Sequence, residues 1–465
     1  MPDTGNPDAR DPDARDPDGG HFDLVVLGSG TAGTKVATTC RAAGWSVAVV
    51  EVRDFGGTCA LRGCEPKKVF WTVAEATERA RLLAPRGVEG GSALRLDWGA
   101  AQAFKRSFTD PVPENREASL REAGIVPIHG QPCFLSPDTL AVGERRLTAR
   151  HVLIATGAAP ARLPIEGAGL LATSDDFLAL EAMPESLVLV GGGYIAFECA
   201  HLAARAGARA TIIQDDDRPL AQFEPELVAR LLERTRALGI EVALNCKVER
   251  IARRGQGFAV ECGNGRTFEG ALVVHGLGRR PALQALGLEA GGVATEKGRL
   301  SLDPYLRSTS NPRVFAAGDA AAQGPALTPV ASHDAAVVAR NLLEGCHTKP
   351  DYGVVPSAVF TIPPMASVGL SEARAREDHP GVEVRQGDMA GYQSVRRTGE
   401  TAAAYKLLVA PGSGLILGAH LLGPEAPEVI NVFALAMRAG MTADDLSRMM
   451  TAYPSGGSNI ASMLG

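Results

Sequence analysis

Two stretches of this 465-residue chain repeat one pattern of strand, glycine-rich turn, helix and strand, and this repeat restricts the possible folds. The first stretch begins with FDLVVLGSGTAG at Phe22, and the second begins with SLVLVGGGYIAFE at Ser186. Short apolar runs rich in β-branched residues that lead through glycines into a helix are typical of buried parallel strands. The repeat therefore predicts an α/β chain with two Rossmann-like dinucleotide-binding domains.

The glycines of the first stretch have the spacing of a pyrophosphate-binding turn. Gly28, Gly30 and Gly33 form G-x-G-x-x-G between the first strand and the helix. Such glycines permit a tight turn and let a phosphate approach the helix N-terminus, whose dipole favours an anion. Glu51 ends the second strand, where a carboxylate can accept hydrogen bonds from a ribose. We therefore expect the first stretch to bind a dinucleotide.

The second stretch keeps this spacing but changes the residue at the ribose position. Gly191, Gly193 and Ala196 occupy the glycine positions, and Gln214 stands where the acid is expected. Residues 215–217 are three aspartates, whereas enzymes that use NADP usually place arginines here to meet the 2′-phosphate. NAD(P)H is the predicted ligand, with NADH favoured. The alternative is that the aspartates form a solvated loop that faces away from the ribose.

The composition excludes several other classes of protein. The formal net charge is −6 and no basic cluster offsets it, so a nucleic acid partner is not expected. No apolar run reaches the roughly 18 residues of a membrane span, and eight cysteines are too few for a secreted disulfide scaffold. Neither the cysteines nor the histidines are spaced like metal ligands. We therefore expect a soluble, cytoplasmic protein with no membrane or metal site.

A pair of cysteines follows the first dinucleotide stretch. In GGTCALRGCEPKK, residues 56–68, Cys59 and Cys64 lie close together in the sequence and two lysines follow them. Two thiols beside a cofactor fold suggest a redox-active disulfide. A neighbouring cation and a helix start lower a thiol pKa from about 8.5 towards neutrality, which thiol–disulfide exchange requires. The alternative is a pair of buried, inert thiols, the usual state of unpaired cysteines.

These motifs together resemble the flavoprotein pyridine nucleotide-disulfide oxidoreductases, the family that contains glutathione reductase, dihydrolipoamide dehydrogenase and mercuric reductase. The resemblance extends from Phe22 to Gly465 and rests on GSGTAG, GGTCALRGCEPKK, IATGAAP, GGGYIAFE, GLGRRP and VFAAGDA. It implies FAD in the first fold, NAD(P)H in the second and a C-terminal α+β dimerisation domain that forms a homodimer.

We place the domain boundaries accordingly. The first twenty residues repeat NPDAR, DPDAR and DPDGG, which leaves little to bury and predicts a disordered tail. The predicted segments are the tail at 1–20, the FAD-binding domain (first part) at 21–163, the NAD(P)-binding domain at 164–284, the second part of the FAD-binding or central domain at 285–347, and the dimerisation domain at 348–465.

The resemblance also implies a role for each residue that matches a motif. Cys64 would be the thiolate that stacks against the flavin, and Cys59 would attack the substrate. Lys67 would lie under the flavin N5 and pair with Glu198, and Tyr194 would be a lid that swings aside for nicotinamide. The implied cofactor-binding residues are Gly28, Gly30, Gly33, Glu51, Thr58, Thr156, Gly157 and Asp319 for FAD, and Gly191, Gly193, Tyr194, Gln214 and Gly278 for NAD(P)H.

The C-terminal segment departs from the family pattern. The family's dithiol enzymes carry H-P-T/A-x-x-E here, a histidine that moves the proton of the leaving thiol and a glutamate that orients it. This chain has Tyr453, Pro454 and Ser458 in the same frame. A tyrosine with a pKa of about 10 can donate a proton but is a poor base at neutral pH. Reduction of ordinary alkyl disulfides should therefore be handicapped, and Tyr453 of the partner subunit is the predicted proton donor.

Three functions fit this combination. The first is an FAD-dependent NAD(P)H oxidoreductase whose Cys59–Cys64 disulfide reduces a metal ion, an activated disulfide or a quinone-like acceptor. Mercury is disfavoured, because no cysteine follows Cys346 to match the C-terminal pair of mercuric reductases. The second is a reductase dedicated to a small-molecule disulfide with Tyr453 as the acid. The third is a diaphorase or a degenerate, non-catalytic flavoprotein, and a dithiol oxidase that works in reverse is a further alternative.

Overall fold

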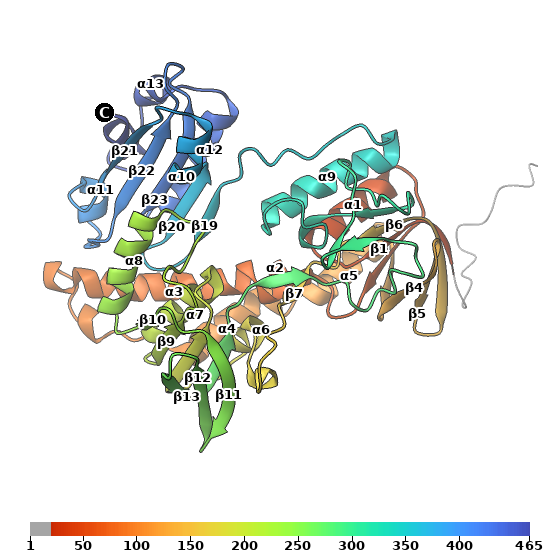
Figure 1. Ribbon diagram of the computed structural model, residues 1–465, viewed down its shortest axis with the longest axis horizontal. Coiled ribbons are helices and arrows are strands. Elements are labelled where there is room, and N and C mark those ends of the chain that lie inside the picture. The colour runs from red at the N-terminus through yellow and green to blue at the C-terminus, as the bar shows by residue number, and fades with distance from the viewer. Residues whose placement is uncertain (1–19) are drawn as a thin grey trace, which may run out of the picture. The chain divides into compact units, whose positions relative to one another are not determined.

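The computed structural model describes residues 20–465, which form two compact units (Figure 1). The predicted tail, residues 1–20, lies outside the described residues except for Gly20. None of the helices in the described part of the chain is long and apolar enough to cross a membrane. Unit 1 comprises the chain up to Cys59 and residues 111–159 and 280–350, and unit 2 comprises residues 60–110, 160–279 and 351–465.

A largely parallel sheet forms the core of unit 1. Its strands follow the order β3-β2-β1-β6-β5-β4, and β18 pairs with β6. Residues 24–27 of β1 are fully buried because β1 pairs in parallel with both β2 and β6. Helix α1 packs against α9. The bounds are β1 (His21–Leu27), α1 (Thr31–Ala42), β2 (Val47–Glu51), α5 (Val112–Glu122), β3 (Val126–His129), β4 (Pro132–Ser136), β5 (Thr139–Val142), β6 (Arg145–Ile154), β16 (Thr295–Glu296), β17 (Arg299–Leu300), β18 (Val314–Ala316) and α9 (Thr328–Glu344).

The dinucleotide fold of unit 2 combines a parallel sheet with a smaller antiparallel one. The parallel strands follow the order β10-β9-β8-β14, and the antiparallel strands follow β11-β12-β13. A shared apolar cluster that includes Val188, Val260 and Val273 joins the two sheets. The bounds are α6 (Ser174–Leu178), β8 (Ser186–Val190), α7 (Tyr194–Arg205), β9 (Arg209–Ile213), α8 (Pro225–Ala237), β10 (Glu241–Ala243), β11 (Val248–Arg254), β12 (Gly257–Cys262), β13 (Thr267–Gly270) and β14 (Leu272–His275).

The C-terminal part of unit 2 is an antiparallel sheet covered by helix α12, drawn in blue in Figure 1. The strand order is β19-β20-β23-β22-β21. Helix α12 packs against β20 and β23, and its side chains Val429, Ile430 and Phe433 are buried. The bounds are β19 (Ser357–Val359), β20 (Met365–Gly369), α10 (Glu372–Asp378), β21 (Glu383–Asp388), α11 (Gln393–Arg396), β22 (Ala404–Val409), β23 (Ile416–Leu422), α12 (Ala426–Arg438), α13 (Ala443–Ser447) and α14 (Ile460–Leu464).

Residues 60–110 group differently from the sequence prediction, which placed them in the FAD-binding domain. They contain α3 (Cys64–Leu83) and α4 (Trp98–Thr109) and belong to unit 2. The Trp98 indole stacks on the Phe70 ring with centroids 4.3 Å apart, and it contacts the Phe177 ring edge-on with centroids 5.7 Å apart. Its Nε1 donates a hydrogen bond to the Leu180 carbonyl at 2.7 Å. These contacts bury the apolar faces of α3 and α4 against α6, so the segment packs with the second dinucleotide fold.

A buried lysine links that fold to the C-terminal sheet within unit 2. Lys406 of β22 donates from Nζ to Glu224 at 2.9 Å, to Glu226 at 2.6 Å and to Glu372 at 2.6 Å. Only 2% of the Lys406 side chain and 3% of the Glu224 side chain are exposed. The hydrogen bond from Lys406 lowers the pKa of Glu372. Two buried opposite charges therefore satisfy each other across segments that are far apart in the sequence.

We predict that Lys406→Met lowers the free energy of unfolding by about 3 kcal/mol, because the Glu224 carboxylate stays buried without its partner. Urea denaturation of the full-length protein measures this decrease in the free energy of unfolding. Arg250→Met is the matched control, since Arg250 forms an exposed ion pair with Glu166 and should leave the free energy of unfolding nearly unchanged. Equal losses in the two variants would contradict the prediction.

The same cluster predicts a pH dependence. Glu372 has a folded-state pKa below its unfolded value of about 4.3. Its contribution to stability is therefore present above about pH 4.3 and disappears as the pH falls through the folded pKa. In Lys406→Met this part of the acid-side loss of stability should be smaller, and the remainder comes from Arg376, which also bonds to Glu372.

Candidate functional site

The glycine turn of unit 1 leaves no room for side chains at two of its three glycines. A Cβ on Gly28, whose φ is +107°, would lie 2.4 Å from the Ala155 carbonyl oxygen, and one on Gly33 would lie 1.9 Å from the Gly28 oxygen. Gly30 precedes α1 and supplies no side-chain cap. The first N–H groups of α1 therefore point out of the turn, as an anion site requires.

Glu51 holds this turn in place through Ser29. Its Oε2 accepts from the Ser29 N–H at 2.9 Å and from Ser29 Oγ at 2.7 Å, while Oε1 accepts from the N–H groups of Val52 and Arg53. Ser29 Oγ in turn accepts from the Gly56 N–H at 3.0 Å. The glycine turn, the predicted ribose-binding acid and the start of the cysteine segment thus share one hydrogen-bond network.

The other predicted FAD residues lie on three further segments of unit 1. Thr156 follows β6 beside the Gly28 turn, and its Oγ1 is buried with no hydrogen-bond partner among the described residues. Gly157 has a φ of +66° with open space where a Cβ would stand. Asp319 lies on the short helix Gly318–Ala320, whose first N–H is held by Asp334 at 3.0 Å. Thr58 is exposed on α2 (Gly57–Arg62).

These features fit FAD. The helix start and its glycines can accept a pyrophosphate, Glu51 stands at the ribose position, and the buried Thr156 hydroxyl needs a partner that a ligand can provide.

The two cysteines occupy consecutive helices. Cys59 is half-buried on α2, and Thr328 Oγ1, at the start of α9, donates a hydrogen bond to its Sγ at 3.1 Å. Cys64 is exposed at the first position of α3, a helix of 20 residues, so it lies at the positive end of the helix dipole. Lys68, one turn further along α3, interacts electrostatically with Cys64. Both surroundings favour thiolate sulfur.

Lys67 and Glu198 form a buried ion pair within unit 2. Glu198 also accepts from Lys68 at 3.4 Å and from the Phe360 N–H at 2.7 Å. Burial alone would raise the pKa of Glu198 and lower that of Lys67, but each charge outweighs this effect on the other: the pKa of Glu198 is lowered and that of Lys67 is raised. The Lys67 ammonium lies 5.2 Å from the centre of the Tyr194 ring. This lysine is therefore charged and adjacent to the predicted lid.

The second glycine turn repeats the construction of the first with an amide in place of the acid. A Cβ on Gly191, whose φ is +108°, would lie 2.6 Å from the Gly276 oxygen, and Gly193 precedes α7. Gln214 Oε1 accepts from the Gly192 N–H at 2.7 Å. Gly278 has a φ of +87° and open space at its Cβ position. The turn and the open start of α7 fit the pyrophosphate of NAD(P)H.

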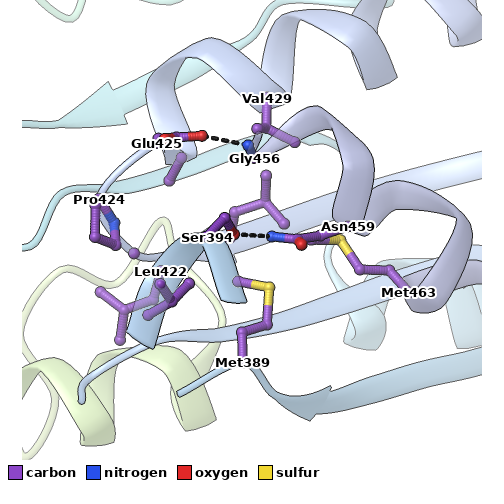
Figure 2. Close-up of a pocket in the computed structure, with 13 residues that line it drawn as sticks. Met389, Ser394, Leu422, Pro424, Glu425, Val429, Gly456, Asn459 and Met463 are labelled. Atoms are coloured by element: carbon purple, nitrogen blue, oxygen red, sulfur yellow. Dashed lines mark hydrogen bonds between the residues drawn. The ribbon is translucent and has the colours of Figure 1, made fainter. Parts of the chain in front are cut away.

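Tyr453 lies on an exposed loop between α13 and α14, with 79% of its surface accessible. Ser458 does not stand in for an orienting glutamate, because its Oγ donates to the Ser455 carbonyl at 2.6 Å and accepts from the Ser455 N–H at 3.2 Å. Figure 2 shows how the loop is anchored beside a pocket: Glu425 accepts from the Gly456 N–H, and Asn459 donates to Ser394 at 2.7 Å. The anchored backbone leaves the Tyr453 ring accessible.

Comparison with known proteins agrees with this construction. Residues 22–335 match the family described as pyridine nucleotide-disulphide oxidoreductase, and residues 355–463 match its dimerisation domain. The chain belongs to this family. Glutathione reductase of Burkholderia cepacia is 31% identical over 93% of this chain and 96% of its own length. Mercuric reductase of Streptomyces lividans is 33% identical over 93% of each protein.

A solved structure matches over nearly the whole chain. It is titled as the Cu(II) complex of the HOCl-induced flavoprotein disulfide reductase RclA from Escherichia coli, and it matches with a TM-score of 0.87 and 27% identity over 96% of this chain and 99% of that one. Family membership confirms the predicted fold class and the cofactors FAD and NAD(P)H. The dimerisation domain indicates a homodimer.

Four residues of the site were missed in the sequence. Ser29 carries the link from Glu51 to Gly56, and Asp334 holds the helix of Asp319. Thr328 donates a hydrogen bond to Cys59, and Lys68 interacts electrostatically with Cys64. The sequence contained a signal for Lys68, because a helix that starts at Cys64 brings the residue four positions later to the same helix face as Cys64. The sequence contained no signal for Thr328, because it is 269 residues from Cys59 and only the packing of α9 brings the two residues together.

We predict that Thr328→Val slows alkylation of Cys59 by iodoacetamide about five-fold at pH 7 in the reduced protein. The variant keeps the shape of threonine but loses a hydrogen bond to sulfur worth about 1 kcal/mol. Peptide mass spectrometry gives the rate at Cys59 alone. Thr38→Val, which removes an exposed hydroxyl of α1, is the control and should leave the rate unchanged. An unchanged rate in Thr328→Val would contradict the prediction.

Proposed function

We propose that this enzyme transfers electrons from NADH, by way of FAD and the Cys59–Cys64 pair, to a small acceptor that needs little help with proton transfer. One observation carries the proposal. The residues around the cysteines and the Lys67–Glu198 pair are complete, whereas the C-terminal loop offers only an exposed Tyr453. Bound FAD supplies the two-electron carrier between the nicotinamide and the cysteines.

In the proposed cycle the two electrons and one proton of a hydride from NADH open the Cys59–Cys64 disulfide to a thiol and a thiolate. Cys59 then attacks a disulfide acceptor, forms a mixed disulfide and releases the first thiol. Cys64 attacks Cys59 next, which restores the internal disulfide and releases the second thiol. The helix start and Lys68 stabilise the thiolate on Cys64 while Cys59 exchanges with the acceptor.

The proton path limits the choice of acceptor. An alkyl thiolate with a conjugate-acid pKa of about 8.5 leaves slowly unless an acid protonates it. We assign that acid to Tyr453 of the partner subunit, since its exposure leaves it accessible to a second copy of the chain. Disulfides of acidic thiols need this help least, so they are the favoured class of substrate.

A second candidate acceptor is Cu(II), because RclA of Escherichia coli is the subject of a solved Cu(II) complex. The described residues contain no group of three or more His, Cys, Asp or Glu that could hold a metal ion. A copper ion would therefore meet the cysteine pair as a substrate rather than occupy a dedicated site.

The preference for NADH is part of the proposal. The aspartates at 215–217 are exposed beside Gln214, and Arg218 donates from Nη2 to the Ala221 carbonyl at 3.0 Å. Because Arg218 bonds within its own loop, the three aspartates dominate the charge at this position. Their negative charge would repel the 2′-phosphate of NADPH.

We predict that anaerobic titration with NADH produces the long-wavelength band of a thiolate beside oxidised flavin. Cys59→Ser should show this band before any reductant is added, because Cys64 then has no partner, and Cys64→Ser should never show it. NADPH should produce the band only at higher concentration. A wild type without the band, or turnover that survives Cys59→Ser, would refute the cysteine path and support the diaphorase function.

We predict that Tyr453→Phe slows the reduction of an alkyl disulfide at least about ten-fold, since general acid catalysis is lost. An aromatic disulfide with acidic thiols, and Cu(II), should be reduced at nearly the wild-type rate. Tyr453→His should increase alkyl disulfide turnover. Equal losses with all three acceptors would mean that Tyr453 shapes the site rather than donates a proton.

A further inference from the structure

A second pair of cysteines lies in the dinucleotide fold of unit 2, away from the motif described above. Cys246 follows β10, and Cys262 ends β12. Both are buried in the apolar cluster that joins the two sheets. Cys262 pairs with Val248 of β11, and Cys246 lies two residues before Val248 in the connection between β10 and β11, so the backbone brings the two cysteines close together. Their thiols share a hydrogen bond.

The surroundings of the two sulfurs differ. Cys246 Sγ accepts from Asn264 Nδ2 at 3.2 Å and faces Arg266 Nη1 at 3.6 Å. The guanidinium is fixed in this position, because Nη2 donates to Glu241 at 2.9 Å and the group lies 4.6 Å from the Phe268 ring centre. Cys246 Sγ therefore lies beside a fixed cation and an amide donor, and its own S–H donates to the Leu244 carbonyl at 3.3 Å.

Burial dominates the surroundings of Cys262. Burial, and secondarily its neighbour Cys246, raise the pKa of Cys262 to about 11, so it remains a thiol at neutral pH. The pair thus combines an attacking sulfur with a protonated resolving sulfur. Asn264 and Arg266, which contact Cys246 Sγ, are both exposed, so Cys246 is buried directly beneath surface side chains.

We propose that Cys246 and Cys262 form a second redox-active dithiol that a peroxide converts to a disulfide. The Cys246 thiolate attacks the O–O bond of hydrogen peroxide, takes one oxygen as a sulfenic acid and, after protonation, releases one water. The Cys262 thiol then attacks the Cys246 sulfur, forms the S–S bond and releases the second water. Two thiols lose two hydrogens and one peroxide is reduced.

The disulfide would act on the second glycine turn. The Cys246 N–H donates to the Gln214 carbonyl at 2.9 Å, and the Gln214 side chain accepts from the Gly192 N–H. An S–S bond to Cys262 would restrict the residue whose backbone N–H bonds to Gln214. We expect the Kd for NADH to rise. This effect depends on the proposed function of the turn, whereas disulfide formation does not.

The test uses full-length holoenzyme with Cys59→Ser and Cys64→Ser, treated with hydrogen peroxide, alkylated and digested with trypsin. Cleavage after Lys and Arg leaves Cys246 on the peptide 237–247 and Cys262 on the peptide 255–266. We expect these peptides to be joined, at 2 Da below the sum of their reduced masses, and separated again by dithiothreitol. Arg266→Gln should slow the linkage roughly five-fold, since a charged donor to sulfur is lost.

Cys40 is the internal control, because burial raises its pKa to about 12 and it should stay unmodified. Cys262→Ser should stop at the sulfenic acid on Cys246, which dimedone traps. Absence of the linked peptides, or oxidation of Cys40 at an equal rate, would overturn the proposal. If the linked peptides form but the Kd for NADH is unchanged, the redox-active dithiol is supported and only its effect on the glycine turn is refuted.

Discussion

Charge buried in unit 2 has to be paired, and this requirement determines how its segments are arranged. Three ion clusters satisfy this requirement, and each of them joins segments that are distant in the sequence. Removing one partner of such a pair costs about 3 to 5 kcal/mol, so other arrangements of α3, the dinucleotide fold and the C-terminal sheet are strongly disfavoured. The clusters are Lys67 with Glu198, Lys406 with Glu224, and Arg205 with Glu78.

The first of these clusters also prepares the chemistry. Glu198 keeps Lys67 charged in spite of burial, and the ammonium lies beside the Tyr194 ring. Electrons and protons nevertheless depend on different parts of the chain. The cysteines are supported by a helix start, a lysine and Thr328, whereas the proposed proton donor is a single exposed tyrosine. An enzyme built this way suits acceptors whose reduced forms are stable without protonation.

Much of this could be predicted from local sequence. The glycine turns, Glu51 and the first strand follow from spacing and apolar pattern, because each depends on neighbours along the chain. The grouping of residues 60–110 could not be predicted. It depends on the stack of Trp98 on Phe70 and the contact with Phe177, and no local pattern specifies which domain an apolar helix face will cover.

The sequence by itself determined the family and the two cofactor folds, and it predicted the pair of redox cysteines, since these reside in short motifs whose backbone geometry is set within a few residues. Only the tertiary structure decided which side chains support them. Thr328 reaches Cys59, and Arg266 reaches Cys246, through packing between separate elements. A hydrogen bond to sulfur requires positions defined to a fraction of an ångström, and only the packed fold supplies that precision.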